Sequence, residues 1–340
     1  MEIAILADDF SGAAELAGIA AACGYVTEVQ TRFDPQSTAE VIAVDTDTRL
    51  RSEHEAISTV ERVTREIALK KPGWIFKKTD SVLRGHVRAE ISAILSATGK
   101  SDCLLIPANP SKGRRIKDGQ YSIDGIPLSE TVLGKDPDFP VQTDRVKVLL
   151  GPSERIVLPN IDELEQIPRS IPATTLPAGA ADFFTTLLGS KGSLVLRKET
   201  RSLLVICGSL AAWDSGRPAE LENCGFSALT LEDPIPSRPW KSSSRIFLAI
   251  GRPHQIAIDA LLPCLVERAR SLIENETDLR IALEGGATAT AFLRAMGWDR
   301  FFVVPENHEG VGTLIPLGAP DGILVSVKPG SYPWPDSLFL

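Results

Sequence analysis

The chain has 340 residues, a length that predicts two domains. Of these residues 43% are hydrophobic and 24% charged, a composition typical of a globular protein. The formal net charge of −8 argues against a binder of nucleic acid or of anionic membranes, although a local basic pocket for a small anion is compatible with it. No apolar run approaches the roughly 18 residues of a membrane-spanning helix. Five scattered cysteines, four histidines without metal-ligand spacing and an N-terminus unlike a secretory signal predict a cytoplasmic protein with reduced thiols.

Strands and helices alternate through the first hundred residues. A helix that follows Asp9 is expected to end at Gly24, and the next helix begins at a capping box formed by Ser52 and Glu55. The alternation predicts a parallel sheet with helices on its faces. The predicted strands are residues 3–6, 41–44, 74–76 and 103–106, and residues 87–98 are predicted to form a helix.

The alternation breaks between residues 107 and 140, which we predict to be a long functional loop with several basic residues. A weaker strand–helix unit follows at residues 155–190. A new alternation begins at residues 203–206, and we therefore place a domain boundary near residue 200. The predicted fold is α/β with two domains, residues 1–200 and residues 201–340, each a mainly parallel, Rossmann-like sheet flanked by helices. Later apolar runs lie at residues 246–250, 281–283, 301–304 and 323–327.

Acidic residues follow the first predicted strand. Asp8, Asp9 and Ser11 lie where this strand meets a helix, and ligands bind at the carboxyl ends of strands in open α/β sheets. One of these residues is enough to cap the helix. Because a second buried aspartate without a role is costly, the pattern favours a functional site.

A dense charged segment, residues 77–85, directly follows the third predicted strand. Within it, Arg84 has the geometry to bind a substrate carboxylate with two hydrogen bonds, and Asp80 could accept a proton or bind sugar hydroxyls. A solvated turn with a salt bridge is the alternative interpretation. The density of charge immediately after a buried strand favours function.

Asp45, Asp47 and Thr48 also follow a buried strand and resemble the Asp-x-Asp-x-Thr nucleophile signature of aspartyl phosphatases, with Arg49 at the fifth position of that signature. Those enzymes also need a downstream lysine and a further acidic pair. No Gly-Asp-x-x-x-Asp follows residue 80, so we interpret the match as accidental and keep a phosphatase as the rival enzyme.

Three turns in the second half bear glycine or serine at strand ends. The turn of Gly285, Gly286 and Thr288 joins a strand to a helix, where glycines let the backbone approach a ligand and free amides favour phosphate. The other two turns contain Gly208 with Ser209, and Lys328 with Gly330. Glycines in such turns are often purely structural, but three of them in one domain predict a nucleotide-binding cradle.

These motifs together resemble the four-carbon acid sugar kinases, which phosphorylate threonate, erythronate and oxo-tetronate. Residues 7–13 resemble the family's opening Ala-Asp-Asp-Leu-Thr-Gly-Ala, and residues 77–85 match its Lys-Lys-Thr-Asp-Ser-Thr-Leu-Arg-Gly with one change, Val82. The Pro-Ala-Asn-Pro segment at 107–110 and the second-half turns are similar to further family elements. Ala287, the residues after Lys328 and a shorter second half depart from the family pattern.

The resemblance implies that the first domain binds the sugar acid and the second domain binds ATP with Mg²⁺. It implies no nucleic-acid or membrane partner, and the sequence allows a homodimer without fixing the oligomeric state. The catalytic base is left open between Asp80 and Asp9. A non-catalytic protein that binds sugar acids or nucleotides is the rival from another class. The implied substrate residues are Asp8, Asp9, Lys78, Asp80 and Arg84, and the implied ATP residues are Ser209, Gly285, Gly286, Thr288 and Gly330.

Overall fold

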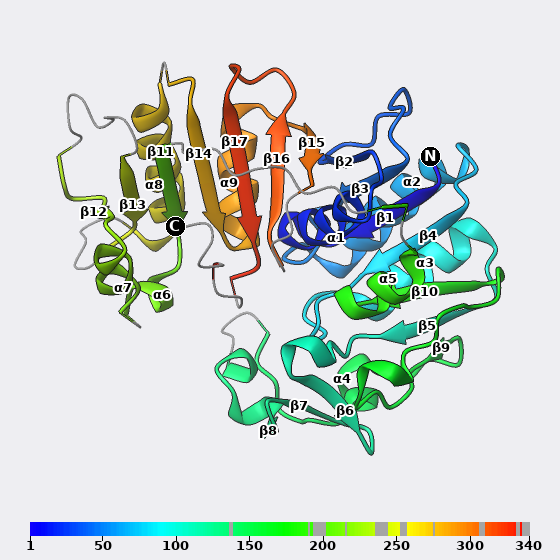
Figure 1. Ribbon diagram of the computed structural model, residues 1–340. Helices are drawn as coiled ribbons and strands as arrows, with labels where there is room; N and C mark the ends of the chain where they lie inside the picture. The colour runs from blue at the N-terminus through cyan, green and yellow to red at the C-terminus, as the bar shows by residue number, and fades with distance from the viewer. Residues whose placement is uncertain are drawn as a thin grey trace.

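A computed structural model describes residues 1–135, 139–189, 191–192, 202–214, 216–234, 244–251, 257–274, 276–305, 310–330 and 334. A mainly parallel sheet of fourteen strands, flanked by helices, dominates these residues (Figure 1). The predicted α/β fold class is therefore confirmed. None of the helices in the described ranges is both long and apolar enough to cross a membrane.

The first half of the chain supplies seven consecutive strands at one end of the large sheet, in the order β2-β3-β1-β4-β10-β5-β9. All neighbouring strands in this part are parallel. The helices and strands predicted as far as residue 106 lie close to their predicted ranges, whereas β2 and α4 were not predicted. The strands are β1 Ile3–Ala7, β2 Thr27–Gln30, β3 Val41–Asp45, β4 Trp74–Lys78, β5 Asp102–Ile106, β9 Ile156–Val157 and β10 Thr175–Gly179. The α-helices are α1 Phe10–Ala22, α2 Glu53–Ala68, α3 Val87–Thr98, α4 Val146–Leu150 and α5 Ala181–Leu188.

The second half of the chain supplies the strands at the other end of the sheet, in the order β12-β13-β11-β14-β17-β16-β15. The boundary predicted near residue 200 falls in a stretch, 193–201, outside the described residues, so the division into two domains stays a proposal. The strands are β11 Ser202–Cys207, β12 Ser227–Leu229, β13 Arg245–Ala249, β14 Leu279–Glu284, β15 Arg300–Val304, β16 Gly312–Pro316 and β17 Ile323–Lys328. The helices are α6 Leu210–Asp214, α7 Arg217–Asn223, α8 Ile258–Ile273 and α9 Gly286–Met296.

An antiparallel pairing of β15 with β2 joins the two halves into one sheet, a connection that the sequence did not reveal. The pairings β15–β16 and β16–β17 are also antiparallel, so β14 and β17 run opposite to β1 along the ladder. On a flat sheet the carboxyl ends of these strands would lie at opposite edges. Strand twist accumulates across the intervening strands, and Figure 1 shows β14 and β17 running down the view while β5 and β10 run across it.

Helix α1 packs against strands of both halves. Eleven of its thirteen residues are buried. Phe10 contacts Phe301 of β15 edge to face, with 5.3 Å between the ring centroids. Small residues allow a close approach, since a Cβ at Gly18 would lie 3.2 Å from the carbonyl oxygen of Val311. A helix buried on nearly all sides needs no polar face, which explains its run of alanines.

The long loop predicted at residues 107–140 contains a small antiparallel sheet that was not predicted, formed by β6 Arg114–Lys117, β7 Gln120–Ile123 and β8 Ile126–Pro127. The two turns are Asp118-Gly119 and Asp124-Gly125, and all four residues have positive φ. Asp-Gly is a strong hairpin signal because both central residues of such a turn take positive φ. Short 3₁₀ helices lie at Pro110–Lys112, Leu128–Glu130, Leu133–Lys135 and Leu164–Gln166.

The predicted capping box at the start of α2 is confirmed. Ser52 Oγ accepts a hydrogen bond from Glu55 N, and Glu55 Oε2 accepts one from Ser52 N at 3.1 Å. We expect Ser52→Ala to lower the free energy of unfolding by about 1 kcal/mol, since it removes this cap. Urea denaturation measures the change, and Ser58→Ala, an exposed site in the same helix, is the matched control. An equal loss in both variants would contradict the prediction.

Candidate active site

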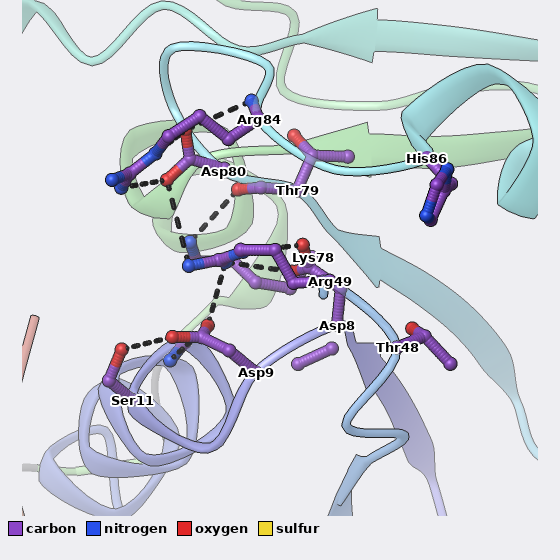
Figure 2. A network of polar contacts seen from close by, with 12 residues as sticks. Asp8, Asp9, Ser11, Thr48, Arg49, Lys78, Thr79, Asp80, Arg84 and His86 are labelled. Carbon is purple, nitrogen blue, oxygen red and sulfur yellow. Dashed lines mark hydrogen bonds and ion pairs between the residues drawn. The ribbon is translucent and has the colours of Figure 1, made fainter. Parts of the chain in front are cut away.

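Arg49 lies at the centre of a polar cluster at the carboxyl ends of β1, β3 and β4 (Figure 2). Its Nε donates to Asp8 Oδ2 at 2.8 Å and its Nη2 to Asp8 Oδ1 at 3.0 Å. Nη2 also donates to Asp9 Oδ1 at 2.8 Å, and Nη1 lies 4.0 Å from Asp80 Oδ1. One guanidinium therefore holds three buried carboxylates from two strand ends.

Asp9 caps helix α1 as well as binding Arg49. Its Oδ1 accepts a hydrogen bond from Gly12 N at 3.0 Å, and its Oδ2 accepts one from Ser11 Oγ at 2.5 Å. A Cβ at position 12 would lie 2.8 Å from Asp9 Oδ1, which explains a glycine there. The capping and functional interpretations of Asp9 are thus compatible, because one side chain has both sets of partners.

Asp80 and Arg84 form a bidentate pair on the other side of Arg49. Arg84 Nε donates to Asp80 Oδ2 at 3.0 Å, and its Nη2 donates to Asp80 Oδ1 at 2.7 Å. Asp80 Oδ2 also accepts from the backbone amides of Val82 and Arg84. The Arg84 side chain is 20% exposed, compared with 7% for Asp80, so of this pair the arginine is the one that solvent reaches.

The charges of the arginines control the ionisation of these aspartates. Burial raises the pKa of Asp8 and of Asp80, but Arg49 in the first case, and Arg84 with Arg49 in the second, outweigh it and hold each pKa below its ordinary value. Burial lowers the pKa of Arg49, and the three aspartates raise it well above its ordinary value. Asp8, Asp80 and Arg49 are therefore ionised at neutral pH.

A chain of buried groups behind the cluster positions Arg49. Lys77 Nζ lies 2.5 Å from Glu90 Oε2, and both side chains are 1% exposed. Glu90 Oε1 accepts from Thr48 Oγ1 at 2.6 Å, and Thr48 precedes Arg49.

Lys78 belongs to the same polar network (Figure 2). A Cβ at Gly12 would lie 3.5 Å from its Nζ and 2.8 Å from Asp9 Oδ1, and its charge lowers the pKa of Asp80. Its Nζ also lies 3.4 Å from Glu15 of α1 and donates to the carbonyl oxygen of Thr79.

The three glycine-bearing turns of the second half come together at the ends of β11, β14 and β17. Gly208 N donates to Thr288 Oγ1 at 3.2 Å, and Gly285 N donates to the carbonyl oxygen of Lys328 at 3.0 Å. A Cβ at Gly330 would lie 3.8 Å from Gly285 Cα. Gly285 has φ +91°, a conformation that glycine adopts without strain. Ser209 is exposed beside them, and its Oγ accepts from Ala212 N.

A buried ion pair supports this glycine turn. Lys328 Nζ lies 3.1 Å from Glu284 Oε1, and the two side chains are 0% and 3% exposed. Glu284 also receives a hydrogen bond from Trp334 Nε1 at 3.1 Å, and Arg217 Nη2 lies 3.3 Å from it. Burial lowers the pKa of Lys328, more than Glu284 raises it. The charged groups fix both strand ends next to Gly285.

The glycine turn lies directly against the cluster of the first half. A Cβ placed on Gly286 would collide with Asp9 Oδ2. A second contact joins the halves nearby, since Arg294 of α9 forms a 2.9 Å ion pair with Asp47. The structure thus brings Asp8, Asp9, Asp80 and Arg84 together beside the turn that holds Gly285, Gly286, Thr288 and Gly330, although the roles of these residues remain predictions.

Sequence reasoning missed Arg49 as a site residue. It follows β3 in the segment that had been interpreted through the phosphatase signature, and a basic residue four positions after a buried strand was the available signal. Among the described residues, no three acidic, histidine or cysteine side chains are arranged to hold a metal ion, because Arg49 lies among the three aspartates.

Residues 3–182 match the family model described as a sugar-binding N-terminal domain, which covers more than half of the chain. The chain belongs to the four-carbon acid sugar kinase family. In this chain the region that matches the family model ends just after β10. It therefore contains Asp8, Asp9, Arg49, Asp80 and Arg84 but not the glycine turns of the second half.

Two curated relatives from this family are similar to part of the chain. A D-threonate kinase of Salmonella typhimurium is 29% identical over 154 residues, which are 44% of this chain and 36% of the relative. A D-erythronate kinase of Heliobacterium modesticaldum is 34% identical over 145 residues, 41% of this chain and 33% of the relative. The matched part thus spans only about a third of each relative's length.

The fold is that of a solved family member. The crystal structure of Haemophilus influenzae protein HI1011, of family DUF1537, superimposes with a TM-score of 0.70 and covers 99% of this chain and 100% of its own. The sequence identity is 16%, so this likeness shows the fold alone.

Proposed function

We propose that the chain is an ATP-dependent kinase that phosphorylates a hydroxyl group of a small sugar acid such as threonate, erythronate or 3-oxo-tetronate. The observation that carries the proposal is the contact between Asp9 and the Gly286 turn. It brings an ionised cluster suited to a carboxylic polyol next to a helix N-terminus suited to phosphate. The names of the relatives support the same chemistry.

Each part of the cluster has a proposed role. Arg84, the partly exposed arginine, would bind the substrate carboxylate, and Asp80 would hold Arg84 in its bidentate geometry. Of the two carboxylates that the sequence left open, Asp9 is the one in contact with the glycine turn. We therefore assign to Asp9 the orientation of the accepting hydroxyl and the acceptance of its proton.

The residues present fit Mg-ATP. The backbone amides of residues 286–288 begin helix α9, and Gly285, where a Cβ would meet nothing within 4 Å, leaves room for phosphate oxygens. Mg²⁺ in kinase sites needs only one or two carboxylates together with phosphates, and when bound it neutralises phosphate charge. Asp9 is the carboxylate beside the turn. Lys328 and Glu284 would keep the strand ends of the turn in place.

Two variants separate the roles of binding and turnover. We expect Asp9→Asn to reduce kcat by about 10²–10⁴-fold, the range for loss of a positioned acid–base group. Arg84→Ala should instead raise KM for the sugar acid by tenfold or more, with a smaller change in kcat, because it removes a carboxylate contact. Steady-state kinetics with varied sugar acid measures both. Unchanged kcat in Asp9→Asn would remove Asp9 from the mechanism.

A screen of four-carbon sugar acids for ADP formation with Mg-ATP tests the function itself. Substrate-dependent ADP supports a kinase, whereas thermal stabilisation by a sugar acid without ADP under any substrate would support the non-catalytic rival. Size-exclusion chromatography with light scattering tests the homodimer that the sequence allows.

The phosphatase rival is weakened by the state of Asp45. This carboxyl is 2% exposed, and burial raises its pKa well above the ordinary value, whereas a nucleophile must be ionised and must reach the substrate. ATP-independent phosphate release that is abolished in Asp45→Asn would restore the rival.

A further inference from the structure

The small sheet of β6, β7 and β8 has no role in the function proposed above. It lies below β5 in the view of Figure 1. Its first residue, Arg114, is buried, with 6% of its surface exposed. Buried arginines are rare and have polar partners, and Nη1 of Arg114 donates a hydrogen bond to Ser81 Oγ. Ser81 directly follows Asp80, so the small sheet reaches the segment that carries Asp80 and Arg84.

The loop after β5 fixes the backbone of Arg114. Arg114 N donates to the carbonyl oxygen of Asn109 at 3.1 Å, and Asn109 N donates to that of Arg114 at 2.8 Å. Asn109 is buried, and its Oδ1 accepts a hydrogen bond from Asp182 N, in the first turn of α5, at 2.9 Å. The carboxylate of Asp182 in turn accepts from Ser111 N at 2.9 Å and from Ser111 Oγ at 2.7 Å. The guanidinium of Arg114 therefore extends from an anchored backbone, as a group that positions another must.

The turn of residues 80–84, which Arg114 contacts, is under backbone strain. Two backbone amides of the turn donate to Asp80 Oδ2, at 3.1 and 3.2 Å. Leu83 has φ +65°, a conformation that is unfavourable for a residue with a Cβ. Such conformations persist only where the surrounding structure holds them. The hydrogen bond from Arg114 to Ser81 supplies a restraint of this kind from outside the turn.

Tyr121 of β7 brings the small sheet close to the same cluster. Its side chain is 1% exposed. Burial raises the pKa of Tyr121, Arg114 lowers it and Asp80 raises it further, so both charges act on this one phenol. The small sheet thus approaches the cluster at two side chains, Arg114 and Tyr121.

We propose that Arg114 is a positioning residue of the sugar-acid site, which acts through Ser81 on the turn that carries Arg84. The proposal rests on the proposed function for the identity of the ligand, a small carboxylate. Arg84 binds the carboxylate, and the buried Arg114 keeps the turn in the conformation that gives Arg84 its bidentate geometry with Asp80. Without Arg114 the strained turn relaxes, and the carboxylate loses an aligned partner.

Isothermal titration calorimetry on the full chain tests this role with threonate, erythronate and 3-oxo-tetronate. For the acid that binds most tightly, we expect affinity to fall about tenfold in Arg114→Ala and in Ser81→Ala, because a less preorganised site binds more weakly. Affinity for Mg-ATP should change less than about twofold in both variants. Arg114→Ala should add less than about twofold to Ser81→Ala, since both substitutions remove one contact.

Arg115→Ala is the matched control. Arg115 is the next residue of β6, its side chain is 33% exposed, and it forms an ion pair with Glu163 at 2.9 Å. We expect near-normal affinity for the acid in this variant. If Arg114→Ala does not fold, Arg114→Lys, which keeps the charge, replaces it in the comparison with Ser81→Ala.

Four results would each overturn the positioning role. They are an equal loss of acid affinity in Arg115→Ala and Arg114→Ala, an equal loss of affinity for Mg-ATP, unchanged acid binding in Ser81→Ala, and additive losses in the double variant. Absence of binding of all three acids to the unmodified chain would overturn it as well.

The same experiment separates this role from the proposed function. ADP formation by the unmodified chain, together with unchanged acid affinity in Arg114→Ala, would overturn the positioning role alone. Acid binding that depends on Arg114 and Ser81, without ADP formation, would support the positioning role and contradict the kinase.

Discussion

Arg49→Ala is expected to destabilise the protein by about 3–5 kcal/mol and to abolish the proposed phosphorylation of a sugar acid. Removal of one partner from a buried ion pair leaves uncompensated charge, and here three carboxylates lose their shared guanidinium. Urea denaturation gives the change in the free energy of unfolding. Arg51→Ala is the matched control, because its ion pair with Asp47 is about 40% exposed and should contribute less than about 1 kcal/mol.

The pH dependence of stability gives a second readout of the same cluster. Asp8 and Asp80 have lower pKa values in the folded protein than their ordinary values, so the folded state binds fewer protons. Their contribution to stability is present above a pH of about 4, the unfolded pKa, and is lost as the pH falls further. This loss should be smaller in Arg49→Ala. Equal acid sensitivity in the two proteins would contradict the assigned role of Arg49.

Gly286→Ala is expected to lower the rate of the proposed phosphorylation by about 100-fold, a loss that misplacement of a reacting group by about 1 Å is sufficient to cause. The new methyl group would collide with Asp9 Oδ2, and Asp9 is held by Ser11, Gly12 and Arg49. The halves would have to separate or Asp9 would have to rotate, and either change moves the acceptor site away from the glycine turn.

Gly318→Ala is the control for that substitution. Gly318 has φ +85° in the turn between β16 and β17, and a Cβ there meets nothing within 4 Å. It therefore costs backbone strain of about 1–2 kcal/mol without a collision. Steady-state kinetics should show near-normal kcat in Gly318→Ala. Equal activity in Gly286→Ala would contradict a functional contact between Asp9 and the turn.

Local signals predicted the elements that carry the site. The helix expected at residues 87–98 has those bounds because Gly99 ends it in a left-handed conformation, and Ser52 begins α2 as predicted. Strand β2 was missed because Thr27–Gln30 is short and three of its four residues are polar. It is buried by the pairing with β15, a long-range contact that no local pattern records.

Local sequence patterns likewise predicted part of the candidate site and missed the part that depends on long-range contacts. Asp9, Asp80 and Arg84 lie in dense polar segments next to strand ends, a pattern that can be read along the chain. Arg49 was missed because its importance comes from three partners that lie about 30 to 40 positions away in sequence. The approach of Gly286 to Asp9 depends on the twist of the sheet, which strand periodicity does not specify.

The continuous sheet also limits how the two halves move. Three residue pairs of β2 and β15, the edge-to-face rings of Phe10 and Phe301, and the ion pair of Arg300 with buried Glu28 cross the junction. A hinge motion between the halves would have to break all of these contacts, so the contacts favour bending of the sheet or displacement of loops over separation of the halves. Amide protons of β2 and β15 should accordingly exchange with deuterium as slowly as those of β1.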